Sequence, residues 1–535
     1  MTKSQAGILV GMLAMASTFA GCGSGSYSPP PPPSIAIATS ALANGAVGFA
    51  YSQTIQAQGG VAPFTWSVST GSLPSGTTLG GGTNNSVTIA GTPDVVENSV
   101  TFTIQVTDTN KQTANQMYLV NIITPRTVTT QEVGQAPAGT IEIQGLSADV
   151  FNPAYWRRNA LNWVPDVRAP MLSAQATGPY QNIYSPWPLE QNSGWLLFYG
   201  GWDGTDTPND RVYKTTTADF YSFGGAAGTP PAPAMPNGQL VIDHGVFTHV
   251  NNMSVQQLAD GSLHMICTTL VDNNSLDKPT YFSSPDAVTW NGTPEPYEAQ
   301  LSDVVSIPND PTYIGYDFNG GNVLLWDANT WVLYYSVGVY GAIGQVYRAT
   351  GNAPPVFQQT GIALKTPHYA NDVKVFEASG KTWYLMSLYV ERTQTDPSPV
   401  TFSYSLSNDG KQFQPEQMLF ALPQGAPDSF GVTPAFVTRA GHVLGVLYGA
   451  NAQDLLSATD AIFARWLQKK VEVVDSTGNT VSAQGGYGPD RQWFAANGSG
   501  ALVGTIRVFA EDGVTPLATG SIDLSSGKAY ALTLQ

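Results

Sequence analysis

The stretch "YANDVKVFEASGKTWYLMSLY", residues 369–389, has the pattern of two β-strands joined by a tight turn. Apolar residues dominate on both sides of a Gly-containing turn at 378–381. Strand-forming residues interrupted by such a turn predict a β-hairpin. Asn371 and Asp372 lie near its start, so we expect an amide and a carboxylate at the mouth of this hairpin.

Similar hairpins recur about 62 residues apart on average. Each has a first strand, a short turn and a strongly apolar second strand. The second strands are expected at 195–201, 263–269, 331–337, 383–389 and 443–449. Five units of paired strands, with further strands behind them, predict a five-bladed β-propeller. We place it within residues 126–469.

The regions on either side of the repeat also have strand patterns. Residues 34–125 contain alternating strands separated by Gly, Pro and Asn turns, which is typical of a β-sandwich. Residues 470–535 predict a small β domain. The chain has 55 Gly and 38 Pro, and only 11% of its residues are charged. The predicted fold class is therefore all-β, with three folded parts.

The stretch from Phe64 to Asp108, "FTWSVSTGSLPSG…GTPDVVENSVTFTIQVTD", resembles a bacterial Ig-like (cadherin-like) repeat. The LPxG, GTP and final VTD elements carry this resemblance. It implies a spacer or adhesive module. Some cadherin-like relatives bind calcium between tandem copies, but this chain has a single copy, so Asp94 and Asp108 are interpreted as turn residues.

The N-terminus has the pattern of an export signal. Lys3 is followed by an apolar run over 6–21, then by Cys22 and a Gly/Ser and polyproline linker that ends at residue 33. This resembles a bacterial lipoprotein signal peptide over 1–21, with Cys22 as the lipidated residue. The resemblance implies an exported protein, anchored to the outer membrane and periplasmic or surface-exposed. An ordinary secretory signal with an incidental Cys is the alternative, because Phe19 departs from the usual Leu.

The charge balance excludes one class of partner. The chain has 22 Lys and Arg against 38 Asp and Glu, a net charge of −16, and no basic run. Nucleic acid is therefore not expected, because phosphate binding needs clustered basic residues. The only other cysteine, Cys267, lies in a strand pattern and is expected to be buried. We expect no cofactor and a monomeric protein, and calcium held by Asp and Asn oxygens remains an open alternative.

A second motif recurs behind three of the hairpins. A Ser or Thr is followed two residues later by Asp and four residues after that by an aromatic residue. The aspartates are Asp219, Asp286 and Asp409. Because one spacing appears in three units, we expect these aspartates to accept hydrogen bonds from turn backbone and to have no catalytic role.

The "YLMSLY" strand (384–389), this turn motif, and the strands at 209–220 and 344–351 resemble the five-bladed glycoside hydrolase superfamily, which includes arabinanase/xylosidase-type and invertase-type enzymes. The resemblance implies a carbohydrate partner and catalysis by paired carboxyl groups. The family's acids do not carry over, because Ser185 and Ser254 stand at the matching positions of the first two blades.

Long loops between second and third strands are expected on one face, around a funnel ringed by Trp202, Asp203, Asp206, Asp210 and Arg392. We predict Asp372 as base or nucleophile, with Asp317 or Glu391 as proton donor. The residues predicted to bind substrate are Trp187, Trp202, Asp203, Asn252, Asn322, Asn371 and Arg392. Carboxamides suit sugar hydroxyls because each offers a donor and an acceptor. Glycan binding without cleavage, and a purely structural adhesin, remain the alternatives.

Overall fold

The computed structural model describes most of the chain. The described residues are 34–81, 85–157, 161–203, 210–224, 226–227, 238–271, 276–310, 321–336, 344–390, 399–453, 459–496 and 503–535. The regular secondary structure of these residues is nearly all β-strand. It includes one short helix, α1 (Pro153–Trp156), and one 3₁₀ turn, η1 (Leu301–Asp303). No helix in these ranges is long and apolar enough to cross a membrane. The predicted all-β class is confirmed.

The N-terminal domain is a sandwich of two four-stranded sheets. Along β3, buried and exposed positions largely alternate, and Tyr51, Ile55 and Ala57 face the other sheet. Because successive side chains of a strand point to opposite faces, this alternation gives each sheet one apolar face, which packs on the core. The strands are β1 (Ala36–Ile37), β3 (Tyr51–Gln58), β6 (Ser86–Gly91) and β5 (Thr77–Leu79), against β2 (Gly45–Ala46), β8 (Thr113–Ile123), β7 (Glu97–Thr107) and β4 (Thr65–Gly71).

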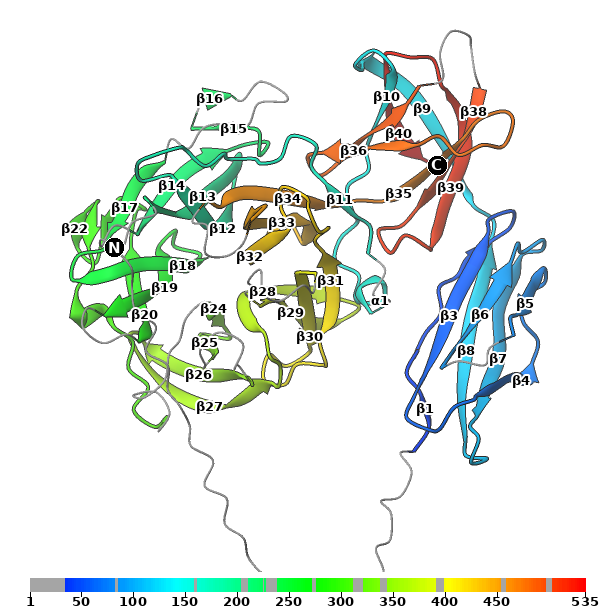
Figure 1. Cartoon of the computed structure of the whole chain (residues 1–535), viewed down its shortest axis with the longest axis horizontal. Helices are drawn as coiled ribbons and strands as arrows, with labels where there is room; N and C mark the ends of the chain where they lie inside the picture. The colour runs from blue at the N-terminus through cyan, green and yellow to red at the C-terminus, as the bar shows by residue number, and fades with distance from the viewer. Residues whose placement is uncertain are drawn as a thin grey trace, which may run out of the picture.

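Five antiparallel sheets form a ring, each sheet being one blade (Figure 1). Blade 1 contains β12 (Asn182–Gln191), β13 (Gly194–Trp202), β14 (Arg211–Thr217) and β17 (Gln239–Asp243), and blade 2 contains β18 (Phe247–Gln257), β19 (Leu263–Val271) and β20 (Asp277–Ser284). Blade 3 contains β24 (Asn322–Asp327), β25 (Thr330–Ser336), β26 (Val346–Ala353) and β27 (Val356–Leu364), and blade 4 contains β28 (Tyr369–Ala378), β29 (Lys381–Tyr389), β30 (Thr401–Ser407) and β31 (Gln417–Ala421). All five predicted second strands are present.

Blade 5 closes the ring. Its inner strands are β32 (Phe430–Arg439), β33 (His442–Asn451) and β34 (Ala461–Leu467), and its outer strand is β11 (Trp163–Pro165). β11 precedes blade 1 in the chain and pairs antiparallel with β34, so Trp163 lies opposite Leu467. The two ends of the propeller are therefore joined by backbone hydrogen bonds within a single sheet.

The C-terminal domain is discontinuous in sequence. Its eight strands run in the order β35 (Lys470–Val474), β38 (Val503–Phe509), β39 (Pro516–Asp523), β9 (Arg126–Gln135), β40 (Lys528–Leu534), β10 (Thr140–Gln144), β37 (Arg491–Ala495) and β36 (Ala483–Tyr487). Residues 126–144, which the sequence analysis placed in the propeller, thus belong to this sheet. β9 pairs parallel with β39 and antiparallel with β40, and β10 pairs parallel with β40 and antiparallel with β37. These partners are more than 300 residues away in the chain, so only the fold determines the pairing.

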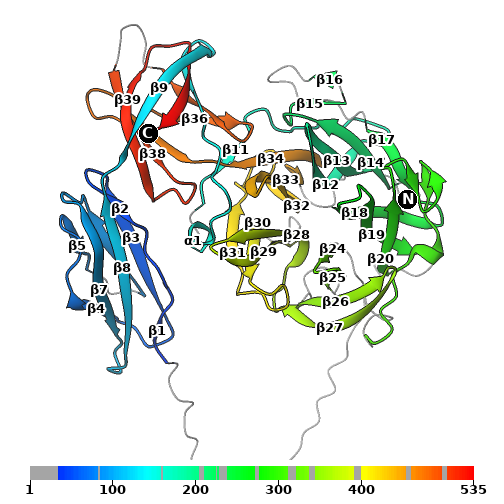
Figure 2. The same ribbon diagram turned by 180° about the vertical axis from the view of Figure 1, so that it is seen from behind.

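The C-terminal sheet lies beside blade 5 and close to the Ig-like domain in both views (Figure 2). Phe49 of the Ig-like domain packs edge-on against Phe509, with ring centroids 5.4 Å apart. On the propeller side, the Trp466 indole donates to Asp166 at 2.6 Å, and the Gly488 N–H donates to the same carboxylate at 2.9 Å. The C-terminal domain thus contacts both other domains.

The three repeated turn aspartates occupy the predicted positions. The Oδ1 of Asp286 accepts the backbone N–H groups of Val288 (2.9 Å) and Thr289 (2.6 Å), and Asp219 and Asp409 make equivalent pairs of bonds. The aromatic residue of each motif is buried beneath its turn: Phe223, Trp290 and Phe413. These contacts are those of scaffold residues.

Candidate functional site

Three aspartates occupy one equivalent position in three blades. Asp210 directly precedes β14, Asp277 is the first residue of β20, and Asp460 directly precedes β34. Each therefore lies where the connection between second and third strands re-enters the sheet, on the long-loop face. All three are buried, with exposed fractions of 5%, 5% and 6%. A buried carboxyl is costly unless its charge is balanced, so the partners of each one indicate its role.

Asp210 is held by two polar side chains from inner strands. The Tyr184 hydroxyl donates to its Oδ2, and the Asn251 amide donates to the same atom at 2.8 Å. The Asn251 amide also lies 2.8 Å from the Tyr184 hydroxyl oxygen. The other carboxyl oxygen, Oδ1, is buried without a hydrogen bond, as is Oδ1 of Asn251. Tyr184 belongs to β12 of blade 1 and Asn251 to β18 of blade 2, so the carboxyl bridges two blades.

Asp460 is the second buried carboxyl near Tyr184. Its Oδ1 accepts the Asn451 amide at 2.6 Å, and its backbone N–H donates to Asn182 Oδ1 at 2.6 Å. Gly449 of β33 permits this close packing, because a Cβ there would lie 2.7 Å from the Tyr184 Cβ. Both aspartates are near enough to the phenol for their charges to raise the pKa of Tyr184, after the larger effect of burial.

Burial raises the pKa of both carboxyls, by different amounts. It raises the pKa of Asp210 to about 6, and the His249 charge and the Tyr184 and Asn251 hydrogen bonds oppose the shift. It raises the pKa of Asp460 to about 7, opposed by the Asn451 hydrogen bond. Both pKa values are raised toward neutral pH, where a carboxyl can donate or accept a proton.

His249 connects the third carboxyl to this cluster. Its Nε2 lies 2.6 Å from Asp277 Oδ1. The backbones of His249 and Asp210 form an isolated β-bridge, and the Val250 N–H donates to the Asp210 carbonyl at 3.2 Å. His249 therefore lies close to Asp210, and its charge opposes the rise in the pKa of Asp210 that burial causes.

Beneath the cluster, a ring of polar residues joins the innermost strands. Ser185, Asn252 and Thr433 each occupy a β-bulge with φ of 49°, 47° and 52°. The Ser185 N–H donates to Thr433 Oγ1 at 3.0 Å, and the Ser185 hydroxyl donates to Asn252 Oδ1. In blade 4, Asn371 donates to the Pro434 carbonyl at 3.0 Å. Bulged, left-handed residues at equivalent points of three blades mark a site where backbone strain is maintained by the surrounding fold.

Asp372 lies deeper than this ring and is fully buried, with an exposed fraction of 0%. Its Oδ2 accepts the Phe436 N–H at 2.9 Å, and its Oδ1 lies 3.1 Å from the Lys374 Nζ. The Lys374 ammonium also lies over the Trp187 ring, 4.3 Å from its centroid. Burial raises the pKa of Asp372, and Lys374 opposes that shift. These contacts connect blades 4, 5 and 1 across the axis, which is a structural arrangement.

Most of the predicted substrate-binding side chains instead make contacts between blades, inside the propeller. Trp187 is fully buried and donates to the Val255 carbonyl at 3.0 Å, so no ring face is available for stacking on a sugar. Asn322 donates to Thr268 Oγ1 at 2.9 Å, and Asn252 and Asn371 belong to the inter-blade ring. These amides serve blade packing because inner strands must satisfy their polar groups against the next blade.

Two predicted residues do lie on the long-loop face. Trp202 ends β13, and Asp203 follows it; both are half-buried. Asp317, Glu391, Arg392, Asp206 and Cys22 lie outside the described residues. Among the described residues, no three His, Cys, Asp or Glu side chains form a group that could hold a metal ion. Cys267 is buried, and burial raises the pKa of its thiol well above the ordinary value.

The sequence analysis placed Asp210 in the funnel without a role and did not identify Asp460 or Tyr184. The sequence did contain a pattern that could have identified these aspartates. The segments "NDRVYK", "LDKPTYF" and "TDAIFARW" all place an Asp at the entry to a third strand, after a long connection. The equivalence is visible only once the third strands are aligned, and their sequences differ too much to align without the fold.

Comparisons with known proteins agree with the N-terminal assignment. Residues 33–123 match the family model described as "Putative Ig domain", and β1–β8 form the corresponding sandwich. This part of the chain is an Ig-like domain. No curated protein matches the sequence.

Several solved structures are similar to the propeller region. A glycosyl hydrolase from Bacteroides ovatus is 9% identical, with a TM-score of 0.40, over 59% of this chain and 96% of that one. Zg3597, a family 117 glycoside hydrolase from Zobellia galactanivorans, is 12% identical, with a TM-score of 0.37, over 58% and 91%. A thermostable family-43 glycoside hydrolase is 11% identical, with a TM-score of 0.36, over 56% and 93%. These structures are distant, and the five blades are defined by the strand pairing above.

Proposed function

We propose that this protein is a glycoside hydrolase whose carboxyl pair is Asp460 and Asp210. In this proposal Asp460 donates a proton to the leaving oxygen, because burial raises its pKa to about 7 and a substantial protonated fraction then remains near neutral pH. Asp210, with a pKa of about 6, supplies the carboxylate that activates water or attacks the sugar. Glycosidic bond cleavage needs one carboxyl in each state.

One observation carries the proposal. Two buried carboxyls lie near one phenol, and among the described residues neither is paired with Lys or Arg and one oxygen of Asp210 has no hydrogen-bond donor. A purely structural carboxyl would be expected to have a paired cation, as Asp372 has in Lys374. Carboxyl groups with raised pKa values that lie together on one face of a rigid scaffold indicate a functional site.

The surrounding groups support a polyhydroxylated substrate. Asn251 has an unbonded Oδ1, and the Trp202 and Asp203 side chains lie at the end of the adjacent strand. Because the carboxyls are nearly covered, a substrate reaches them only if binding uncovers the cluster. A glycan that binds this face without being cleaved is therefore the second candidate function, and the same experiment tests it.

The experiment is a screen of the exported chain against plant and algal oligosaccharides, measuring both released sugar and binding. Asp210→Asn and Asp460→Asn should each abolish most of the turnover on the responsive glycan, while Asp409→Asn, in a scaffold turn, should not. Cleavage that survives in both cluster variants would overturn the assignment. Binding without cleavage, weakened by the same two substitutions, would favour the second candidate.

We also propose that the protein belongs to the bacterial envelope. We expect cleavage after residue 21 and lipidation of Cys22, with residues 22–33 as a stalk and the folded domains in the periplasm or outside the cell. Labelled fatty acid should enter the wild-type protein and be lost in Cys22→Ser. An unlabelled wild type in a host that processes lipoproteins would contradict this part of the proposal without affecting the carboxyl pair.

A further inference from the structure

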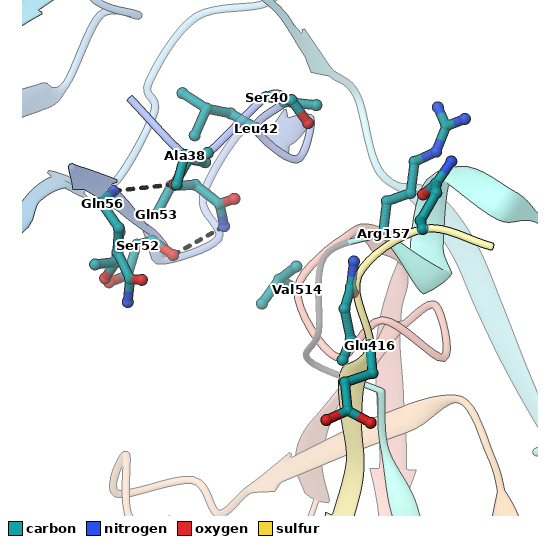
Figure 3. Close-up of a pocket in the computed structure, with 14 residues that line it drawn as sticks. Ala38, Ser40, Leu42, Ser52, Gln53, Gln56, Arg157, Glu416 and Val514 are labelled. Atoms are coloured by element: carbon teal, nitrogen blue, oxygen red, sulfur yellow. Dashed lines mark hydrogen bonds between the residues drawn. The ribbon is translucent and has the colours of Figure 1, made fainter. Parts of the chain in front are cut away.

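A second polar cavity lies far from the carboxyl cluster, where the three domains meet (Figure 3). Its volume is about 930 Å³. One wall consists of residues 38–42 and 52–56 of the Ig-like domain. The opposite wall consists of Arg157 after α1, residues 414–417 before and at the start of β31, and Val514 of the C-terminal domain. Cavities of this size hold small-molecule ligands in other proteins.

The lining is unusually rich in hydroxyls and carboxamides. The Ig-like wall contributes Thr39, Ser40, Ser52, Thr54, Gln53 and Gln56. The propeller wall contributes Gln414 and Gln417, and the Tyr404 hydroxyl lies 2.8 Å from Gln417 Oε1 and also contacts the Trp156 carbonyl. The apolar lining residues are Ala38, Ala41, Leu42 and Val514. Groups that both donate and accept hydrogen bonds suit a ligand with many hydroxyls.

Two charged residues line the cavity, Arg157 and Glu416, and they differ in their partners. Arg157 is exposed, its guanidinium lies 4.8 Å from the centroid of the Trp383 ring, and no carboxylate in the described parts of the chain pairs with it. The one acidic lining residue, Glu416, is already engaged: its Oε2 lies 2.7 Å from His368 Nδ1 and 3.0 Å from Thr366 Oγ1. In a protein with a net charge of −16, an unpaired arginine in a polar cavity favours an anionic ligand.

We propose that this cavity binds an acidic oligosaccharide. The sugar hydroxyls contact the carboxamides and hydroxyls of both walls, and a carboxylate or sulfate group pairs with Arg157. Because the ligand contacts the Ig-like domain and the propeller together, its binding also holds the two domains in one relative position. The site does not depend on the carboxyl pair, so it would retain a charged glycan whether or not the funnel cleaves it.

The test measures affinity by calorimetry for three probes: a uronic acid trisaccharide, a sulfated oligosaccharide of similar length, and a neutral xylo-oligosaccharide. The acidic probes should bind more tightly, and the stronger of the two identifies the anionic group. Arg157→Gln should weaken binding of the acidic probe by about ten- to a hundredfold, the range of a charged hydrogen bond. Gln56→Glu, on the opposite wall, should weaken it too, because it adds a like charge.

Arg439→Gln is the matched control. Arg439 also stacks on a tryptophan, with its guanidinium 3.8 Å from the Trp195 centroid, but it does not line this cavity and lies beside Glu190 at the turn after β32. This substitution should leave the affinity for the acidic probe unchanged. No binding of either acidic probe, or equal losses in Arg157→Gln and Arg439→Gln, would overturn the proposal. Melting temperatures of all variants exclude unfolding as the cause, and Gln56→Glu keeps the test valid if Arg157→Gln is unstable.

Discussion

Asp210 and Asp372 are both buried aspartates in the same propeller, yet their surroundings differ fundamentally. Asp372 has a Lys ammonium 3.1 Å from Oδ1 and a backbone N–H bonded to Oδ2. Asp210 has neutral donors on Oδ2 and, among the described residues, no Lys or Arg paired with it. In both aspartates Oδ1 is buried and makes no hydrogen bond with the described residues, so the difference between them is the adjacent ammonium. Burial alone therefore does not mark a functional acid; a buried carboxyl without a paired cation is the better candidate.

The largest expected effect distinguishes the two carboxyls by activity. Asp210→Asn should lower turnover on the responsive glycan by about 10²–10⁴-fold, because the amide cannot supply the negative charge that a base or nucleophile contributes. The measurement is the initial rate at saturating substrate, with Asp372→Asn assayed under conditions where it is folded. If both substitutions lowered turnover equally, Asp372 would also belong to the catalytic machinery, as the sequence suggested.

The second test concerns stability. Asp372→Asn should lower the free energy of unfolding by about 3 kcal/mol, because it leaves the partly buried Lys374 ammonium without its counter-charge. Urea denaturation measures the loss. A double-mutant cycle with Lys374→Met provides the control: the double variant should recover much of the stability, since the unpaired charge is gone. If the effects of the two substitutions on the free energy of unfolding simply added, the ion pair would not contribute to stability.

The third test uses pH and Asp460. Between the ordinary carboxyl pKa near 4 and its folded pKa of about 7, the unfolded chain releases a proton that the folded protein retains. The unfolded state then binds fewer protons, so stability falls as pH rises through this window, by about 3–4 kcal/mol for this group. Asp460→Asn should remove that contribution, so its stability relative to wild type should be greater at pH 7.5 than at pH 4.5. Parallel pH curves for wild type and variant would contradict the raised pKa.

The smallest expected effect comes from a scaffold aspartate. Asp409→Ala should cost about 1 kcal/mol, because it removes two turn hydrogen bonds of 2.8 and 3.0 Å from a partly solvated site. Thermal unfolding measures the change, and glycan turnover or binding at low temperature should remain intact. Activity lost without any change in melting temperature would mean that the repeated turn motif has a functional role.

The sequence by itself determined the parts that depend on local patterns. Period-two alternation and Gly-containing turns predicted the hairpins, their recurrence predicted five blades, and the Ser/Thr-x-Asp spacing predicted the turn aspartates. The Ig-like domain was also identifiable from its own residues. These features involve neighbours within a few residues, so their physical causes are visible in the chain order.

Only the tertiary structure decided which carboxyls are compensated. The partner of Asp372 on β32 is 64 residues away, and the residue that Asp460 contacts on β12 is 278 residues away. The same holds for β11, which completes blade 5, and for β9 and β10, which join the C-terminal sheet. A buried charge is stabilised or left reactive by groups that meet it only when the ring closes, and no local pattern records which groups those are.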